Sequence, residues 1–214
     1  MKKSLLLMTA VLAAAAATVT TVSSQENAMS FFITSVGSGD GANLGGIAGA
    51  DAQCQSLAQA AGSRGKTWHA YLSVQGDAHE NARERIGFGP WYNAKGVMVA
   101  ENLNFLHSER MDLGKQNSLT ENGDMVKGRG DTPNQHDILT GSGLDGRTID
   151  DGSNHTCNNW TSNDEGTAQA GHFDRQGGGA NPNSWNSAHG TRGCSQENLV
   201  STGGNGYFYC FAID

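Results

Sequence analysis

Polar side chains able to hold a cation or a sugar gather in the run DTPNQHD, which begins at Asp131. This run places two carboxylates, two carboxamides and a histidine in seven residues, and the run DGRTIDDGSN at residues 145–154 follows closely. Such oxygen-rich groups chelate calcium or form hydrogen bonds with sugar hydroxyls. The same residue types cap turns, so local loop chemistry is the competing interpretation. From this run we take Asn134, Gln135 and Asp137 as candidate ligand-binding residues.

A second group lies in the stretch CNNWTSND at residues 157–164. A cysteine three residues before a tryptophan favours a disulfide packed against a core indole. The polar end of the stretch then remains free to meet solvent. Asn163 and Asp164 therefore join the candidate ligand-binding residues.

Trp185 is the tryptophan that polar residues flank on both sides, in NPNSWNSAHG. An indole presented by such a loop can stack on a sugar ring, or it can fill a small second sheet. Both interpretations stay open, and Trp185 is kept as a candidate sugar contact.

The histidines do not form a known catalytic or zinc motif. No G-x-S-x-G elbow supports a serine hydrolase, and the absence of C-x-x-C and H-E-x-x-H argues against zinc. We therefore expect no enzyme, and a hydrolase that uses a loop histidine with an aspartate is the weakest of the functional hypotheses. The histidines placed in loops are His136, His155, His172 and His189.

The N-terminal sequence predicts export. Two lysines precede an apolar run at residues 5–17, which is typical of a signal peptide over about residues 1–24, cleaved between residues 17 and 28. Removal of this leader changes the net charge from −7 to about −9. A chain this acidic repels nucleic acid and heparin-like polyanions. We expect one domain at residues 29–214, secreted or periplasmic, without a membrane span.

Hydrophobic periodicity predicts a small number of short elements in a glycine-rich chain. Residues 46–62 have the spacing of a helix with Cys54 on its buried face, and Gly62 ends it. Residues 29–36, 66–74 and 206–214 are expected to be β-strands or short β-rich runs. Residues 96–100 form a short apolar run, and a helical turn is expected to end near His107. Residues 110–154 are almost wholly polar, so a long functional or mobile loop is expected there.

Four cysteines in an exported chain predict two disulfides. Four cysteines allow three pairings, and spacing alone does not choose among them.

The order of these landmarks resembles the C-type lectin-like fold in its endostatin-type version, and also a group of exported bacterial lectin-like proteins. The landmarks are GADAQC, WHAYLS, GSGLDGR, CNNWTS, a further cysteine and YFYCFAI. The resemblance covers most of residues 31–214. It implies an α+β domain with small antiparallel sheets, long polar loops and two nested disulfides, Cys54 with Cys210 and Cys157 with Cys194.

The sugar-binding branch of this fold also suggests a place for calcium. There, a Glu-Pro-Asn run and a Trp-Asn-Asp run supply the ligands, and Asn134, Asp137, Asn163 and Asp164 lie near the matching places. This sequence departs from the pattern, because Thr132 replaces the glutamate and two residues separate Trp160 from its Asn-Asp pair.

These observations lead to an exported, non-enzymatic binding module whose ligand is a carbohydrate or a cell-surface polymer. A structural or protein-interaction domain of the cell envelope is the alternative hypothesis.

Overall fold

The computed structural model describes residues 28–214, and the predicted signal peptide lies outside these residues. The helices are α1 (Gly46–Ala60), α2 (Ala82–Arg85), α3 (Leu103–Leu106), α4 (Cys157–Trp160), α5 (Gln196–Thr202) and the 3-10 turn η1 (Gly76–Ala78). The strands are β1 (Phe31–Ile33), β2 (Trp68–Ala70), β3 (Trp91–Tyr92), β4 (Met98–Ala100), β5 (Asp137–Leu139), β6 (Gln169–His172), β7 (His189–Gly190) and β8 (Gly204–Ala212). Within the described residues, none of the helices has the length and apolar character needed to span a bilayer.

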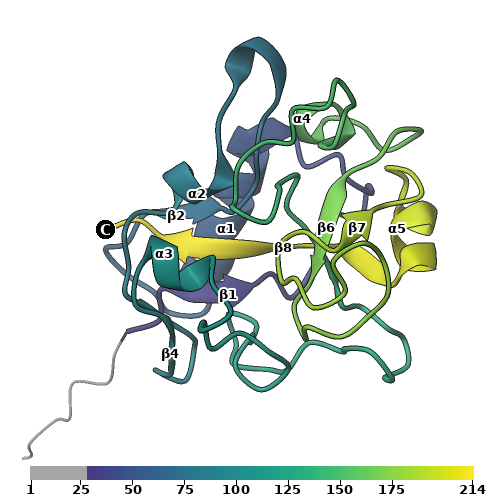
Figure 1. Ribbon diagram of the computed structural model, residues 1–214. Coiled ribbons are helices and arrows are strands. Elements are labelled where there is room, and N and C mark those ends of the chain that lie inside the picture. The colour runs from purple at the N-terminus through teal and green to yellow at the C-terminus, as the bar shows by residue number, and fades with distance from the viewer. Residues whose placement is uncertain (1–27) are drawn as a thin grey trace, which may run out of the picture.

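The C-terminal strand β8 organises the main sheet, as Figure 1 shows. Its second half pairs with β1 on one side and β2 on the other, both antiparallel. Its first half pairs with β5 in parallel, and β6 and β7 then extend the sheet. The result is a six-stranded mixed sheet, with β3 and β4 forming a separate hairpin. The expectation of only small antiparallel sheets is therefore wrong for the β5–β8 pair.

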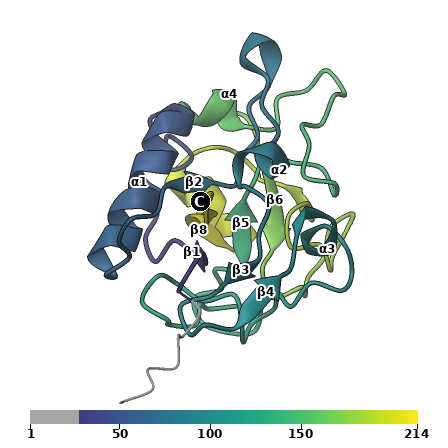
Figure 2. The ribbon, with the colours of Figure 1, turned by 90° about the vertical axis from the view of Figure 1, so that its left-hand side faces the viewer.

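Alternate residues of β8 point to opposite faces of the main sheet, and a hydrophobic core lies on each face. Phe208 and Cys210 belong to the core beneath α1, which also contains Trp68 and Trp160. Figure 2 shows α1 lying along one side of the sheet. The predicted helix is confirmed, with Cys54 fully buried on its inner face.

The polar stretch at residues 110–154 contains a strand that sequence analysis did not predict. Strand β5 lies between β8 and β6, and all three of its residues are buried. It contributes only two apolar residues, Ile138 and Leu139, so no alternating pattern reveals it. This strand matters because it places Asp137 inside the molecule.

The nested disulfide pairing is confirmed. Cys54 is bonded to Cys210 with a sequence separation of 156, and Cys157 is bonded to Cys194 with a separation of 37. The outer bond joins α1 to β8, and the inner bond joins α4 to the segment that leads into α5. Two such bonds are consistent with an oxidising, extracytoplasmic compartment.

The segment labelled α4 is a left-handed turn. Its four consecutive residues all have positive φ, including 54° at Asn158 and 53° at Asn159. Left-handed backbone costs an L-residue about 1–2 kcal/mol, and asparagine tolerates it better than most residues. The turn is held by the inner disulfide, by the buried Trp160, and by hydrogen bonds between Asn159 and Gln75.

Replacement of Asn158 should reveal this backbone conformation. We expect Asn158→Ala to lower the free energy of unfolding by about 1 kcal/mol relative to Asn158→Gly, because glycine carries no left-handed penalty. Asn104 is an exposed asparagine of the right-handed helix α3 and should show the opposite order, with alanine the more stable. Urea unfolding of the four variants measures both differences, and the same order at both positions would contradict a left-handed α4.

His107 is a half-buried imidazole that packs against the rings of Tyr71 and Trp185. Its Nδ1 donates to the Leu103 carbonyl at 2.8 Å, so its Nε2 accepts from the Tyr71 hydroxyl at 2.7 Å. Burial lowers the pKa of His107 to about 4. Since the unfolded imidazole titrates near pH 6.5, protonation favours the unfolded chain, and stability falls as pH decreases from 6.5 toward 4.

This shift predicts a pH dependence that one substitution removes. Between pH 7 and pH 4 the wild type should lose about 3 kcal/mol more unfolding free energy than His107→Gln, which has no titrating group there. Urea unfolding in EDTA at the two pH values gives this difference directly. Equal losses in both proteins would show that His107 is not held neutral.

Candidate metal centre

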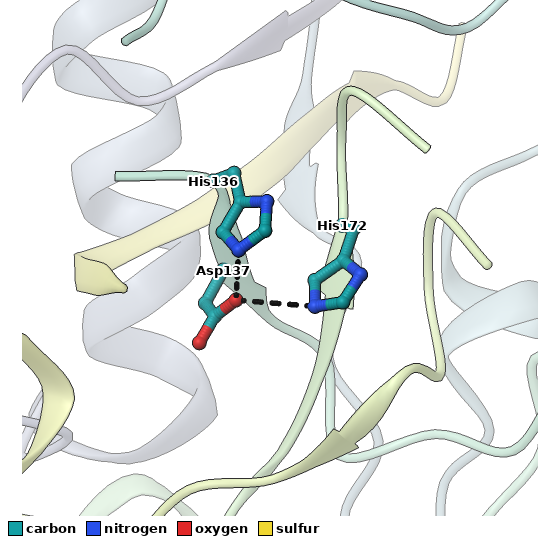
Figure 3. A group of neighbouring side chains, drawn as sticks. All are labelled: His136, Asp137 and His172. Carbon is teal, nitrogen blue, oxygen red and sulfur yellow. Dashed lines mark ion pairs between the residues drawn. The ribbon is translucent and has the colours of Figure 1, made fainter. Parts of the chain in front are cut away.

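Four side chains from three neighbouring strands converge at one end of the main sheet. Asp137 opens β5, His136 directly precedes it, His172 ends β6, and His189 begins β7. The Nε2 atoms of the three histidines lie 3.2, 3.4 and 3.5 Å from Oδ1 of Asp137, in that order. Figure 3 shows His136 and His172 pointing at the same carboxylate.

The other nitrogen of each histidine already has an oxygen partner. Nδ1 of His136 lies 3.2 Å from the carboxylate of Asp174, and Nδ1 of His172 lies 2.8 Å from the carbonyl of Pro182. Nδ1 of His189 lies 3.1 Å from the carbonyl of Gly190. These oxygens can only accept, so each neutral ring carries its proton on Nδ1. In its neutral form, each of the three rings therefore points the lone pair of Nε2 at Asp137.

The Asp137 carboxylate is buried without a hydrogen-bond donor. The residue Asp137 is 3% exposed, and neither carboxylate oxygen has a hydrogen-bond partner within the described part of the chain. Nε2 of His172 also lacks one. Burying a carboxylate against three lone pairs costs several kcal/mol unless a positive charge lies between them.

The three separations from Oδ1 of Asp137 are close to the ligand-to-ligand distance of a tetrahedral metal site. A zinc ion with bonds of about 2.0–2.1 Å to nitrogen and oxygen ligands has ligand-to-ligand edges of about 3.3 Å. The three measured distances, from 3.2 to 3.5 Å, lie around that value. The oxygen acceptors on Nδ1 are the partners that metal-bound histidines usually have.

Neighbouring backbone fixes the orientation of the rings. The rings of His136 and His172 are stacked, with centroids 4.3 Å apart. A Cβ on Gly177 would lie 2.1 Å from Cε1 of His172, and one on Gly203 would lie 3.3 Å from Cδ2 of His136. Only glycine lets the chain approach the rings this closely.

Electrostatics distinguish the members of the cluster. Burial lowers the pKa of His172, although its contact with Pro182 opposes the shift. The contact with Asp137 raises the pKa of His189, against a smaller effect of burial. For Asp174 burial alone would raise the pKa, but hydrogen bonds from His136 and the backbone of Arg129 together hold it below its usual value.

The other residues predicted beside Asp137 lie at the edge of this cluster. A Cβ on Gly203 would lie 2.7 Å from Nδ2 of Asn134, and Oδ1 of Asn134 is buried without a hydrogen-bond partner in the described structure. Gln135 makes a weak contact of 3.4 Å with the Tyr207 hydroxyl. Asp137 itself is only 3% exposed and donates its backbone N–H to the Gly203 carbonyl, so it is too deeply buried to contact an external sugar directly.

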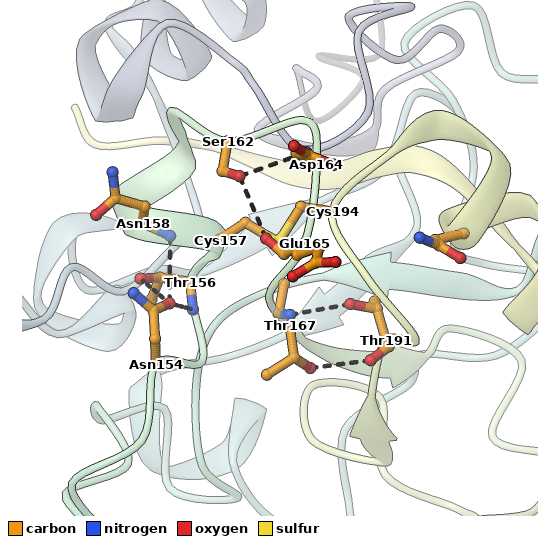
Figure 4. Close-up of a disulfide and its surroundings, with 12 residues drawn as sticks. Asn154, Thr156, Cys157, Asn158, Ser162, Asp164, Glu165, Thr167, Thr191 and Cys194 are labelled. Atoms are coloured by element: carbon orange, nitrogen blue, oxygen red, sulfur yellow. Dashed lines mark hydrogen bonds between the residues drawn. A yellow bond between two sulfur atoms is a disulfide. The ribbon is translucent and has the colours of Figure 1, made fainter.

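Asn163 and Asp164 lie elsewhere, near the inner disulfide, as Figure 4 shows for Asp164. The Asp164 carbonyl accepts from the backbone N–H of Cys194, next to the start of α5, and Asn163 donates to Asp40. Asn134 contacts the residue after the other end of α5, a helix about 10 Å long. The four residues expected to share a calcium ion are therefore split between the two ends of α5.

Trp185 is a core residue with 2% of its surface exposed. Its indole packs against Tyr71 and Tyr209, with ring centroids 4.9 and 5.1 Å away. Its carbonyl accepts from the Tyr209 hydroxyl at 2.7 Å. The indole therefore fills the core and does not present a face for stacking on a sugar.

In the sequence, the three histidines are only weak catalytic candidates. They are separated by long, irregular stretches of chain and therefore do not match a short zinc-binding motif. The available signal was the recurrence of histidine beside glycine or aspartate in short polar segments: HD at His136, GHFD at His172 and AHG at His189. That signal gains meaning only when β5, β6 and β7 are known to be neighbours.

Comparisons with known proteins do not assign this cluster. A scan against models of protein families finds no match, and a search of curated proteins finds no significant match.

Proposed function

We propose that the protein is an extracytoplasmic metal-binding module that holds one Zn²⁺-class ion with His136, Asp137, His172 and His189. The observation that carries the proposal is the buried Asp137 carboxylate, which faces three Nε2 atoms and has no hydrogen-bond donor among residues 28–214. Bound there, the ion would neutralise the carboxylate and accept the three nitrogen lone pairs.

A proton-bridged network is the competing explanation for the cluster. In that case one or two histidines would be protonated and would pair with Asp137. The two networks differ in one observable respect: a protonated cluster is indifferent to chelators, whereas a metal centre is not.

The ligand chemistry selects the class of ion. Imidazole nitrogen suits zinc, copper, nickel and iron, whereas calcium takes six to eight oxygen ligands. Three nitrogens and one carboxylate oxygen therefore favour a transition metal over the calcium ion suggested by the resemblance. Four nitrogen and oxygen ligands, with three separations of 3.2 to 3.5 Å from Oδ1 of Asp137, favour zinc among the transition metals.

Calorimetric titration of the oxidised protein, stripped with EDTA and dialysed, tests the proposal. We expect one Zn²⁺ per chain, no competition from millimolar Ca²⁺, and at least about 100-fold weaker binding by His172→Ala. His155→Ala is the matched control, because His155 also contacts a carboxylate, that of Asp151 at 2.9 Å, but on the surface. Absence of zinc binding, or an equal loss in the control, would refute the metal centre.

The finer fold assignment is part of the same proposal. The nested disulfides, the helix beneath the sheet and the long C-terminal strand support a C-type lectin-like domain of the endostatin type. The absence of enzymatic activity, and the exclusion of nucleic acids and heparin-like polyanions, stay predictions.

Carbohydrate binding also stays a prediction, but we now place the sugar site in a different part of the molecule. A cavity of 450 Å³ lies beside the Trp185 loop, lined by the apolar side chains of Met111 and Leu144 and by the carboxamides of Asn181 and Asn183. This volume is within the range of ligand sites. Titration with neutral disaccharides, compared between the wild type and Leu144→Asp, examines this cavity.

A further inference from the structure

The four side chains of the metal centre are not equally accessible. His136, Asp137 and His172 are 5%, 3% and 1% exposed, and their donor atoms all lie within 4.8 Å of one another. His189 is not part of this compact group. Its side chain is 24% exposed, and its distance to Asp137 is the longest of the three.

The two buried rings are fastened by distant parts of the chain. His136 is held by the buried carboxylate of Asp174 and by stacking on His172. His172 is held twice by the loop that follows β6: its ring contacts the Pro182 carbonyl, and its backbone N–H donates to the Ser184 carbonyl at 2.8 Å. Neither ring can turn away without breaking these contacts.

His189 is fastened much more weakly. Its ring meets the edge of His172, with centroids 4.9 Å apart, and within residues 28–214 its Nδ1 reaches only the carbonyl of the next residue, Gly190. Its strand, β7, has two residues and pairs with β6 alone, at the edge of the sheet. One side of the ring is also packed, because a Cβ on Gly179 would lie 3.0 Å from Cδ2 of His189. The ring therefore has a neighbour there, but among the described residues its Nδ1 has no hydrogen-bond anchor outside its own strand.

Resting on the proposed metal function, we propose that His189 is the exchangeable ligand of the centre. The ion enters and leaves on its side, and an external neutral nitrogen donor of the imidazole class can take its coordination position. The buried trio of His136, Asp137 and His172 keeps hold of the ion during the exchange. Such a centre can transfer its ion to an external acceptor. A closed structural zinc site differs, because all four of its protein ligands stay bound to the ion.

Rescue by free imidazole tests this assignment. His189→Ala leaves a gap at the solvent side, so it should still bind one Zn²⁺, with an affinity about 10- to 100-fold below the wild type. Millimolar imidazole should recover most of the zinc affinity that His189→Ala has lost. It should also slow the transfer of zinc from this variant to a chromogenic chelator. His172→Ala is the matched variant, because its gap is sealed in the core and imidazole should not restore binding.

Three results would overturn the exchange role while leaving the metal centre intact. These are a loss in His189→Ala as large as that in His172→Ala, no rescue of His189→Ala by imidazole, or equal rescue of both variants. Failure of the wild type to bind zinc would instead refute the metal function itself. Circular dichroism and melting in EDTA confirm that both variants are folded before the titrations.

Discussion

Saturating zinc should raise the melting temperature of the oxidised wild-type protein by roughly 8–16 °C. An ion present at a thousandfold its Kd stabilises the native state by about 4 kcal/mol, provided that it does not bind the unfolded chain. In a domain of this size each kcal/mol shifts Tm by roughly 2–4 °C. Differential scanning fluorimetry or calorimetry, with zinc and with EDTA, measures the shift.

Asp137→Asn should separate the metal centre from a proton-bridged network. The variant should lose most of the zinc-induced rise, because a neutral carboxamide is a poor zinc ligand. In EDTA, however, it should melt at or above the temperature of the wild type. The carboxamide N–H groups can donate to the Nε2 atoms that face the site, and an unpaired buried charge is removed. A variant that melts several degrees lower in EDTA, with no zinc effect in either protein, would favour the proton network.

Removal of the outer disulfide should be the largest single loss of stability in the molecule. In the chain-entropy model, a bond closing a separation of 156 residues contributes about 5 kcal/mol, and one closing 37 residues contributes about 4 kcal/mol. A typical domain is stable by about 5–15 kcal/mol, so loss of the Cys54–Cys210 bond consumes a large part of the total.

Paired alanine variants measure this difference. Urea unfolding in EDTA should show a larger decrease for Cys54→Ala with Cys210→Ala than for Cys157→Ala with Cys194→Ala. Release of the left-handed turn at α4 should offset part of the loss in the second pair, which widens the gap. A larger decrease for the inner pair would mean that the inner bond supports packing beyond its effect on chain entropy.

Elements with a clear apolar period were predictable from the sequence. The helix α1 and the strand β8 carry regular spacing, with Cys54 and Cys210 on faces that meet, and the structure places them as expected. Strand β5 was not predictable, because two apolar residues in a polar stretch do not define a period. Its burial comes from its parallel pairing with β8, which is a tertiary effect.

The candidate site was only partly predictable for the same reason. Asp137 was selected as a ligand for its oxygen atoms, but its partners were expected to be nearby carboxamides and the distant Asn163 and Asp164. The histidines that surround it come from β6 and β7, and their approach depends on the order of strands in the sheet. Trp185 was ambiguous because flanking polar residues do not show which way an indole points.

The most direct measurement is diffraction from crystals of the zinc-loaded protein on both sides of the zinc absorption edge. An anomalous peak is predicted about 2.0–2.2 Å from Nε2 of His136, His172 and His189 and from Oδ1 of Asp137. A crystal grown from a protein with one equivalent of zinc that shows its peak elsewhere, or shows none, would contradict the metal centre.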